Sequence, residues 1–310
     1  MVALMIEIRE IGDRELEAWL ALVASVRAER AGSVEDYLDW KRQAEDMGWF
    51  VASSGDDDVG AGFAYVGWHS EPGTGHGEAF VRAEHRGTGV GSELYRYIAG
   101  WVADRGCVVL ETSVSESDAD SLAWADRRGF REVSRTSRLV LDLTAIEAPS
   151  IDPPAGVEIT TWAEWPDLIR AIYEVASEAY PDEPGSANRP IDPFEVWLSQ
   201  DMQGHADMPE ATFVALLDGE VVGYAKLVHS SSRKNVCIHD MTGVKRDFRG
   251  RGIAGALKRA EIRWAKEHGF EKLETSNEAR NEPIRRLNER HGYVVTPGDV
   301  VLREALAGPD

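Results

Sequence analysis

Two short glycine-rich segments have the residue types and spacing most suited to binding chemistry in this sequence. They are Arg86–Gly91 (RGTGVG) and Arg249–Ala254 (RGRGIA), and each lies between a predicted strand and a predicted amphipathic helix. Glycine lets a backbone turn tightly and approach a ligand closely. The first-turn amides of the helix are unpaired donors, and the helix dipole there favours negative charge. We therefore expect each segment to bind a phosphate or a pyrophosphate.

Neither segment fits the common nucleotide-binding motifs. A P-loop requires Lys-Ser or Lys-Thr after its glycines, and no such pair follows them here. The spacing is Arg-x-x-Gly-x-Gly or Ala instead of Gly-x-Gly-x-x-Gly. A Rossmann unit would also begin with its strand and loop, whereas a long series of strands and helices precedes Arg86. The pattern therefore indicates a phosphate-bearing ligand held by a different fold.

The two segments belong to an internal repeat. Residues 81–130 align with residues 244–293 at a constant offset of 163 without a gap, and 14 of these 50 positions are identical. The same offset aligns Phe50-Val51-Ala52 with Phe213-Val214-Ala215. A period of this length exceeds the unit of a solenoid protein, which runs to about 50 residues. The sequence therefore predicts a duplicated domain.

A proline-rich segment marks the predicted boundary between the two copies. A strand-like run at 138–143 is followed by residues 148–156, in which Pro153, Pro154 and Gly156 stop regular structure. A second strand-like start follows at Val157, as the first did at Ile6. The predicted organisation is an N-terminal domain at 1–148, a linker at 149–156 and a C-terminal domain at 157–310.

The elements around the loops follow the same order in both copies. A short strand and a helical region lead into paired strands at 49–52 and 59–66, matched by 212–217 and 221–228. After each loop we expect an amphipathic helix, another strand, a second helix and a final strand. Strands and helices mixed in this order favour an α/β (α+β) fold with a mixed sheet. The second copy carries about twelve extra residues before its core, which we assign to 180–193.

Charge limits the classes of partner. The chain has 34 basic and 54 acidic residues, a formal net charge of −20. A protein that neutralises the phosphates of a nucleic acid or an anionic membrane needs clustered Lys and Arg, so we expect neither partner. The negative field favours a small cationic molecule, although acidity that only aids solubility explains the same composition.

Cysteine content and the start of the chain bear on location. Cys107 and Cys237 are too few for a disulfide framework or a four-ligand zinc site, so we predict reduced thiols and no metal. No apolar run approaches 18 residues, and Met1–Arg9 lacks the basic start of a secretory signal. We therefore expect a cytoplasmic protein.

The loop pattern carries a resemblance to a known family. Arg-x-x-Gly-x-Gly/Ala, after a strand that ends in valine, resembles the acyl-CoA pyrophosphate loop of the GNAT superfamily of N-acetyltransferases. Gly129-Phe130 and Gly292-Tyr293 resemble the closing Gly-Phe of that superfamily, and the duplication resembles its tandem-domain group. The resemblance covers nearly the whole chain. It implies two GNAT-like domains with splayed strands, and acetyl-CoA as the co-substrate whose pantetheine lies between those strands.

The resemblance also implies which residues contact acetyl-CoA. Asn281 falls where the superfamily often has a pantetheine-contacting asparagine, and Asp118 has that place in the first copy. Asn288 and Ala125 replace the tyrosine that usually protonates the leaving thiolate, so water or another side chain takes that role. The implied contacts are Val81, Arg82, Ala83, Arg86, Gly87, Thr88, Gly89, Val90, Gly91 and Ser92, and Val244, Lys245, Arg246, Arg249, Gly250, Arg251, Gly252, Ile253, Ala254, Gly255 and Asn281.

The implied reaction needs a base, because an amine must lose a proton during N-acetyl transfer. The strand before each loop offers His239 and Asp240 in the second copy and Glu78 in the first. Asp240 and His239 are the first candidates for the base or for an ammonium anchor, with Glu78 as the first copy's counterpart. Structural roles stay open, because His239 can be an ordinary hydrogen-bonded histidine and Asp240 can cap a turn.

The sequence thus predicts an N-acetyltransferase that moves an acetyl group from acetyl-CoA to a primary amine of a small, cationic acceptor. The second domain, whose motifs match better, is predicted to be catalytic. Two alternatives stay open: an acyl-CoA-binding regulatory module without turnover, and a structural pseudo-enzyme that binds no CoA. The missing tyrosines favour the first, and the intact glycines of both loops argue against the second. The sequence names neither the acceptor nor an oligomeric state.

Overall fold

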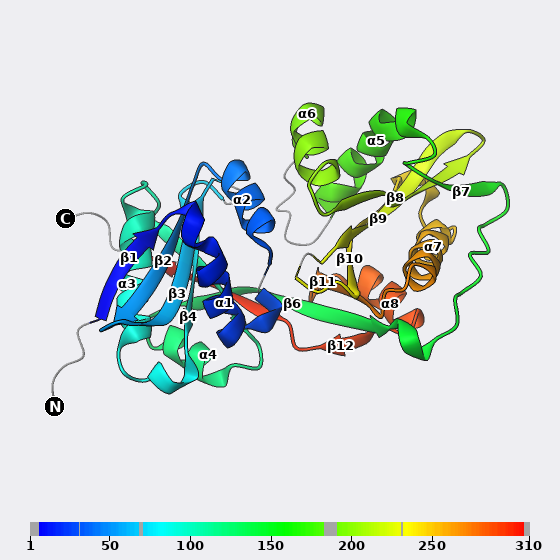
Figure 1. Ribbon diagram of the computed structural model, residues 1–310. Helices are drawn as coiled ribbons and strands as arrows, with labels where there is room; N and C mark the ends of the chain where they lie inside the picture. The colour runs from blue at the N-terminus through cyan, green and yellow to red at the C-terminus, as the bar shows by residue number, and fades with distance from the viewer. Residues whose placement is uncertain (1–5, 31, 68–70, 183–190, 231, 307–310) are drawn as a thin grey trace. The chain divides into compact units, whose positions relative to one another are not determined.

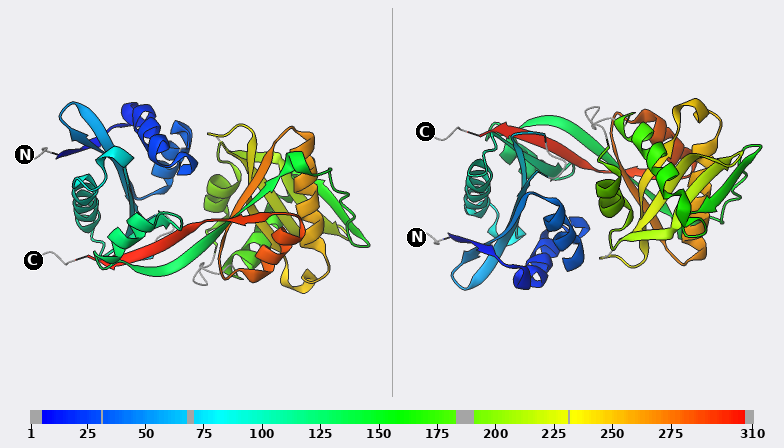
Figure 2. Two further views of the ribbon diagram at one scale, coloured as in Figure 1. Left: turned by 90° about the horizontal axis from the view of Figure 1, so that it is seen from below. Right: turned by 90° about the horizontal axis from the view of Figure 1, so that it is seen from above.

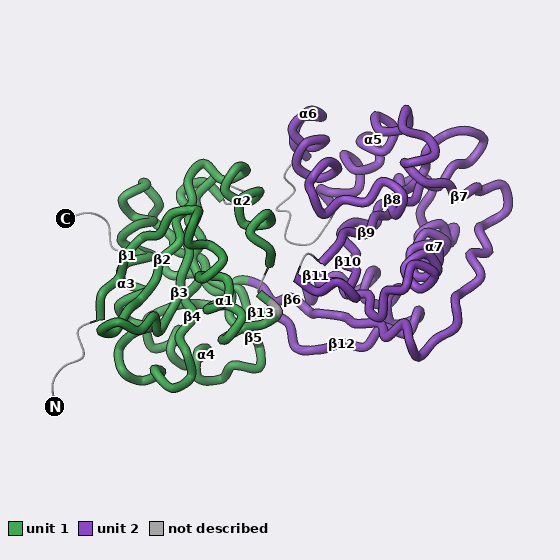
Figure 3. Tube along the Cα trace, viewed as in Figure 1, with its two compact units in different colours: residues 1–133, 299–310 green, residues 134–298 purple. Residues whose placement is uncertain are grey.

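The computed structural model describes residues 6–30, 32–67, 71–182, 191–230 and 232–306. The chain forms two compact units, of which unit 1 comprises residues 1–133 and 299–310 and unit 2 comprises residues 134–298 (Figure 3). Each unit has a mixed sheet with helices on both faces (Figures 1 and 2). The predicted α/β fold with a mixed sheet is confirmed.

The sheet of unit 1 has the strand order β1-β2-β3-β4-β5-β13. Neighbouring strands are antiparallel except β4 and β5, which are parallel. One core, which includes Trp19 and Phe63, lies under α1 and α2, and the other, which includes Leu94 and Ile98, lies under α3 and α4. The elements are β1 (Ile6–Ile11), α1 (Leu16–Val26), α2 (Val34–Gln43), β2 (Asp46–Ser54), β3 (Asp57–Val66), β4 (Thr74–Val81), α3 (Val90–Ala103), β5 (Val109–Ser115), α4 (Ala119–Asp126) and β13 (Asp299–Ala305).

Unit 2 repeats this plan with the strand order β6-β11-β10-β9-β8-β7, and β12 also pairs with β6. Here β10 and β11 are the parallel pair. Its elements are β6 (Arg131–Asp142, which begins in unit 1), β7 (Val157–Thr161), α5 (Ile169–Ala179), α6 (Phe194–Trp197), β8 (Asp207–Leu217), β9 (Glu220–His229), β10 (Val236–Val244), α7 (Ile253–Glu267), β11 (Lys272–Glu278), α8 (Glu282–Arg290) and β12 (Val294–Thr296).

No helix among the described residues is both long enough and apolar enough to cross a membrane. The insertion that we assigned to 180–193 lies mostly outside the described residues, which omit 183–190. Its first residues form the short 3-10 helix η6 (Tyr180–Asp182).

The last strand of each half departs from the sequence prediction. The run at 138–143, expected to complete the first copy, lies in β6 and pairs with β11 of unit 2. The strand β13, near the end of the chain, pairs with β5 of unit 1 along its whole length. The units therefore exchange their final strands, and the predicted linker 149–156 lies inside unit 2. Both final strands have buried apolar residues on one face, so their sequences do not specify which sheet they join.

In each copy the parallel pair of strands separates after three residue pairs. The pairing of β4 with β5 ends at His76↔Glu111, and that of β10 with β11 ends at Ile238↔Glu274. The rest of β4 and of β10 pairs only with the strand on its other side. The splayed strands that the resemblance implied are thus present in both units.

The exchange of β13 predicts where a core substitution in it acts. Leu302 is buried in the core under α3, so Leu302→Ala should lower the free energy of unfolding by about 2–5 kcal/mol. Hydrogen exchange should accelerate in β5, the partner of β13, more than in β11. Val294→Ala in β12, an exposed position, is the matched control and should have little effect. Loss of protection in β11 instead would contradict the exchange.

Candidate active site

The glycine loops form the predicted strand–turn–helix geometry in both units. Gly87 and Gly89 have φ angles of +76° and +104°, and Gly250 and Gly252 have +75° and +86°. Side chains other than glycine rarely adopt these angles. A Cβ atom at Gly87 or Gly250 would meet no atom within 4 Å, so the space beside each loop is open. These observations fit a loop whose backbone amides bind phosphate at the start of α3 or α7.

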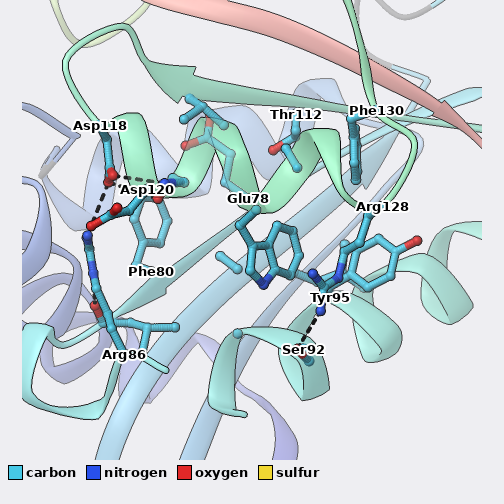
Figure 4. A pocket seen from close by; sticks show the side chains of 18 of the residues that line it. Glu78, Phe80, Arg86, Ser92, Tyr95, Thr112, Asp118, Asp120, Arg128 and Phe130 are labelled. Carbon is cyan, nitrogen blue, oxygen red and sulfur yellow. Dashed lines mark hydrogen bonds and ion pairs between the residues drawn. The ribbon is translucent and has the colours of Figure 1, made fainter. Parts of the chain in front are cut away.

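A cavity of about 690 Å³ lies in unit 1, at the gap between β4 and β5 (Figure 4). It extends from the glycine loop past α3 and α4 to the end of α1. Ile98 of α3 and Glu78 of β4 both line it, although they belong to opposite faces of the sheet. The splayed strands therefore open a passage through the sheet. The loop residues that line the cavity are Arg86, Gly87, Gly89, Gly91 and Ser92.

Backbone groups of β4 are available along this gap. The amide of Arg82 donates to the carbonyl oxygen of Val59 in β3 at 3.1 Å. In an antiparallel pair, alternate residues direct their N–H and C=O groups to the same neighbour. The backbone groups of Ala79 and Val81 therefore point into the gap, and both residues line the cavity. The prediction of strand-like contacts with pantetheine fits Val81, whereas the amide of Arg82 is already bonded.

Glu78 lies toward the end of the cavity away from the loop, and on β4 only Gly77 lines the cavity beyond it. Its carboxylate is 2.9 Å from a guanidinium nitrogen of Arg30 and 3.4 Å from Nε2 of His76. Burial alone would raise the pKa of Glu78, but the charge of Arg30 and the hydrogen bond from His76 lower it overall. Glu78 is therefore ionised at neutral pH.

His76 lies between two carboxylates. Its Nδ1 is 3.7 Å from Glu111, on the side opposite Glu78. Burial acts to lower the pKa of His76, but the neighbouring carboxylates of Glu111 and Glu78 outweigh it and raise the pKa overall. The sequence analysis did not select His76 or Arg30. One signal for His76 was available, because it recurs as His239 at the offset of the repeat.

The other end of the cavity is rich in cations. Arg86 donates to the carbonyl of Val81 at 3.4 Å and contacts Asp118 at 3.3 Å. Arg128 lies 3.7 Å from the ring centre of Trp124 and donates to the Ser92 hydroxyl at 2.6 Å (Figure 4). Asp118 also caps α4 by accepting from the amide of Ser121. Arginine is suited to phosphate because its planar guanidinium offers several donors.

The position of the missing tyrosine also faces this cavity. Ala125 of α4 lines it and offers no acidic proton. Across the cavity, the hydroxyl of Tyr95 in α3 donates to Glu304 at 2.5 Å. Burial and then Glu304 raise the pKa of Tyr95, so this phenol stays protonated at neutral pH.

Unit 2 has a buried polar cluster at the corresponding place. His239 contacts the Tyr293 hydroxyl through Nε2, and its Nδ1 is 3.1 Å from Glu261. Lys258 is 3.4 Å from the same carboxylate, and each of the four side chains is at most 5% exposed. At the repeat offset, Lys258, Glu261 and Tyr293 correspond to residues of unit 1 that line the cavity, namely Tyr95, Ile98 and Phe130.

The electrostatics of this cluster leave His239 neutral. Burial and then Lys258 lower its pKa, and Glu261 only partly offsets them. Burial would raise the pKa of Glu261, but Lys258 and His239 lower it overall. A neutral, buried imidazole that contacts Tyr293 and Glu261 fits a packing role better than a proton-transfer role.

The structure separates Asp240 from His239. A β-bulge between His239 and Met241 places Asp240 beside Lys226, at 3.0 Å, whereas His239 lies against α7. Lys226 also contacts Asp207 at 2.7 Å. The two candidate residues therefore contact different groups on different faces of the strand.

Two arginines at the second loop are paired with one carboxylate. Asp182 of η6 contacts Arg246 at 2.8 Å and Arg249 at 2.7 Å. Hydrogen bonds from Arg246 and then Arg249 lower the pKa of Asp182 to about 2. Asn281 lies at the start of α8, and Asn288 is buried and donates to Asn277 at 3.2 Å. Two arginines that the resemblance places in contact with acetyl-CoA are thus already paired with a carboxylate.

The site and the fold agree with the family to which the sequence belongs. The pattern of the Acetyltransferase (GNAT) family matches residues 14–130 and 169–293. The chain therefore belongs to that family, as a GNAT-type N-acetyltransferase with two family domains.

Three similar proteins illustrate the relationship. A mycothiol acetyltransferase of Brachybacterium faecium is 28% identical over 248 residues, which cover 78% of this chain and 72% of that protein. A tandem GNAT protein from the clavulanic acid biosynthesis pathway has a TM-score of 0.78 at 20% identity, covering 99% of this chain and all of that one. A GCN5-related N-acetyltransferase from Sphaerobacter thermophilus has a TM-score of 0.76 at 23% identity, covering 98% and 97%. The two structures share the fold.

The buried cluster of unit 2 predicts a pH-dependent stability. Glu261→Gln should lower the free energy of unfolding by about 3–5 kcal/mol at neutral pH, because Lys258 would keep a buried charge without its partner. The folded-state pKa of Glu261 lies below its usual 4.5, so its contribution is complete above 4.5 and is lost as the pH falls through the folded value. Denaturant unfolding of both proteins at several pH values measures this difference. A constant difference down to pH 3 would contradict it.

Proposed function

We propose that this protein transfers an acetyl group from acetyl-CoA to the amine of a small molecule, and that unit 1 carries out the transfer. The cavity of unit 1 is the observation on which the proposal rests, because it joins the glycine loop to an ionised carboxylate. The sequence alone favoured the second domain. We favour the first because the corresponding space in unit 2 is taken up by Lys258, Glu261 and Tyr293.

Acetyl-CoA, when bound, supplies the acetyl group as a reactive thioester. The amides at the start of α3, with Arg86, are placed to bind its phosphates, and Ala79 and Val81 offer backbone groups in the gap. One of these amides can also donate to the oxygen that becomes negative during transfer. The chain's own part is thus to bind, orient and stabilise charge.

Glu78 has the position and charge of the base in this proposal. It lines the cavity beside the splay, where an acceptor that enters past Val26 and Arg27 would place its amine. A carboxylate there first anchors the ammonium form and then takes a proton, directly or through water. The small, cationic acceptor predicted from the net charge fits this carboxylate. The name of the mycothiol acetyltransferase relative also supports a small-molecule acceptor.

A calorimetric titration with acetyl-CoA tests the location of binding. We expect one equivalent per chain. Gly87→Val should abolish binding, whereas Gly250→Val should leave it intact. The two variants are matched, because the φ angles are +76° and +75° and a Cβ at either position meets nothing within 4 Å. Two equivalents would mean that both units bind acetyl-CoA. Loss of binding only in Gly250→Val would place the site in unit 2.

Substitution of the proposed base tests the chemistry. Glu78→Gln should lower kcat/KM for amine acetylation by roughly 100- to 10,000-fold, because the amide cannot accept the proton. The affinity for acetyl-CoA should not change, since Glu78 lies at the other end of the cavity. Asp240→Asn is the corresponding variant in unit 2. If it lowered kcat/KM by a comparable factor while Glu78→Gln stayed active, the catalytic unit would be unit 2. Release of CoA thiol with a panel of amines measures both.

A further inference from the structure

A chain of alternating charges runs through Glu78 in unit 1. From Glu78 it continues through Arg30 at 2.9 Å to Asp299 at 3.3 Å. In the other direction it continues through His76 at 3.4 Å to Glu111 at 3.7 Å. Arg303 ends it, at 2.7 Å from Glu111. When His76 is protonated, which its two neighbouring carboxylates favour by raising its pKa, the six groups carry three positive and three negative charges.

Both ends of this chain of charges, Asp299 and Arg303, lie on β13. Asp299 and Arg303 are four residues apart, so in a strand they lie on the same face. The pairing Arg303↔Glu111 fixes the register at one end. At the other end, Asp299 also contacts Arg27 at 2.9 Å. The opposite face of β13 is anchored by Val300 and Leu302 in the core under α3, so the two charged side chains are held at fixed positions.

The order of contacts gives Arg303 a defined effect on Glu78. Arg303 also contacts Glu71 at 2.9 Å, so its guanidinium is held by two carboxylates. Arg303 thereby holds the carboxylate of Glu111 in position. Glu111 in turn holds the side chain of His76, and His76 and Arg30 together hold the carboxylate of Glu78. A buried charge that loses its partner moves or changes its protonation, because the low dielectric penalises an unpaired charge.

We propose that the last strand of the chain completes the active site of unit 1, with Arg303 and Asp299 as positioning residues that hold Glu78 in its working geometry. The inference rests on the proposed role of Glu78 as base. It means that a strand which follows all of unit 2 in the sequence controls proton transfer in unit 1.

Other titratable groups also lie beside this chain of charges. The ring of Tyr65 in β3 lies 4.9 Å from that of His76, and Tyr37 of α2 is close enough for Glu78 to influence it. Burial and then Glu78 raise the pKa of both phenols, so both stay neutral at neutral pH. The charged groups around Glu78 are therefore the side chains of His76, Glu111 and Asp299, with the cations of Arg27, Arg30 and Arg303.

Replacement of Arg303 tests the proposal by kinetics. Arg303→Met should lower kcat by roughly 10- to 100-fold, as expected for a displaced reactive group, with the KM for acetyl-CoA unchanged. Arg303→Lys, which keeps the charge, should lose less. The matched control is Arg42→Met in α2, because Arg42 is an exposed arginine of the same unit with a single local ion pair to Asp39. Equal kcat in Arg303→Met and the control would overturn the proposal.

The titration of His76 in the free protein is a second readout, independent of activity. If Arg303 holds Glu111 in place, its loss releases Glu111, and the pKa of His76 falls. If Arg303 is only a nearby cation, its loss removes a repulsion, and the pKa of His76 rises. The histidine ring signals in NMR, assigned with His76→Gln, distinguish the two signs. A rise would overturn the proposal.

One further variant, together with Glu78→Gln, completes the test. Should Arg303→Met fold poorly, Glu111→Gln keeps the shape of the side chain and removes the same link. The pKa of His76 should then fall, and the acid limb of kcat/KM should move to higher pH because Glu78 loses a cation. An unchanged acid limb in a folded Glu111→Gln would contradict the proposal. If Glu78→Gln itself stays fully active, the proposed function fails instead, which keeps the two failures distinct.

Discussion

The early end of pairing between two parallel strands is the constraint on which the rest of this protein depends. After His76 in β4 and Ile238 in β10, the strands lose their neighbour, and backbone groups face a gap. Buried amides and carbonyls need partners, so such a gap must be filled by side chains, water or a ligand. The loops that follow, with left-handed glycines at Gly87 and Gly250, aim further amides at the same region.

The two copies fill this gap in different ways. In unit 1, Tyr95 and Ile98 leave a cavity that reaches the loop. In unit 2, Lys258 and Glu261 occupy the same helix positions and form a buried ion pair with His239 beside it. Such a cluster is stable only while every member keeps its partners. Duplication thus preserved the fold, while substitutions on one helix changed what the gap contains.

The exchange of final strands ties the two copies to each other. Unit 1 lacks an edge of its sheet until β13, at 299–305, has been added. That strand supplies apolar residues to the core and two charged residues, Asp299 and Arg303, to the chain of ion pairs that contains Glu78. The first half of the sequence therefore depends on residues 299–305 for part of its core and for two of the charges in the series that contains Glu78.

The sequence by itself determined the duplication, the mixed α/β fold, the two glycine loops and the family, because these depend on local patterns and on spacing at a fixed offset. Only the tertiary structure decided which sheet each final strand joins, since two strands of similar pattern fit either edge. It also decided which groups the candidate catalytic residues contact. The bulge at Asp240 turns His239 toward α7. Arg30 contacts Glu78, and Arg303, far from it in sequence, contacts Glu111 beside His76. Contacts of this kind arise from packing between distant elements, which no local pattern records.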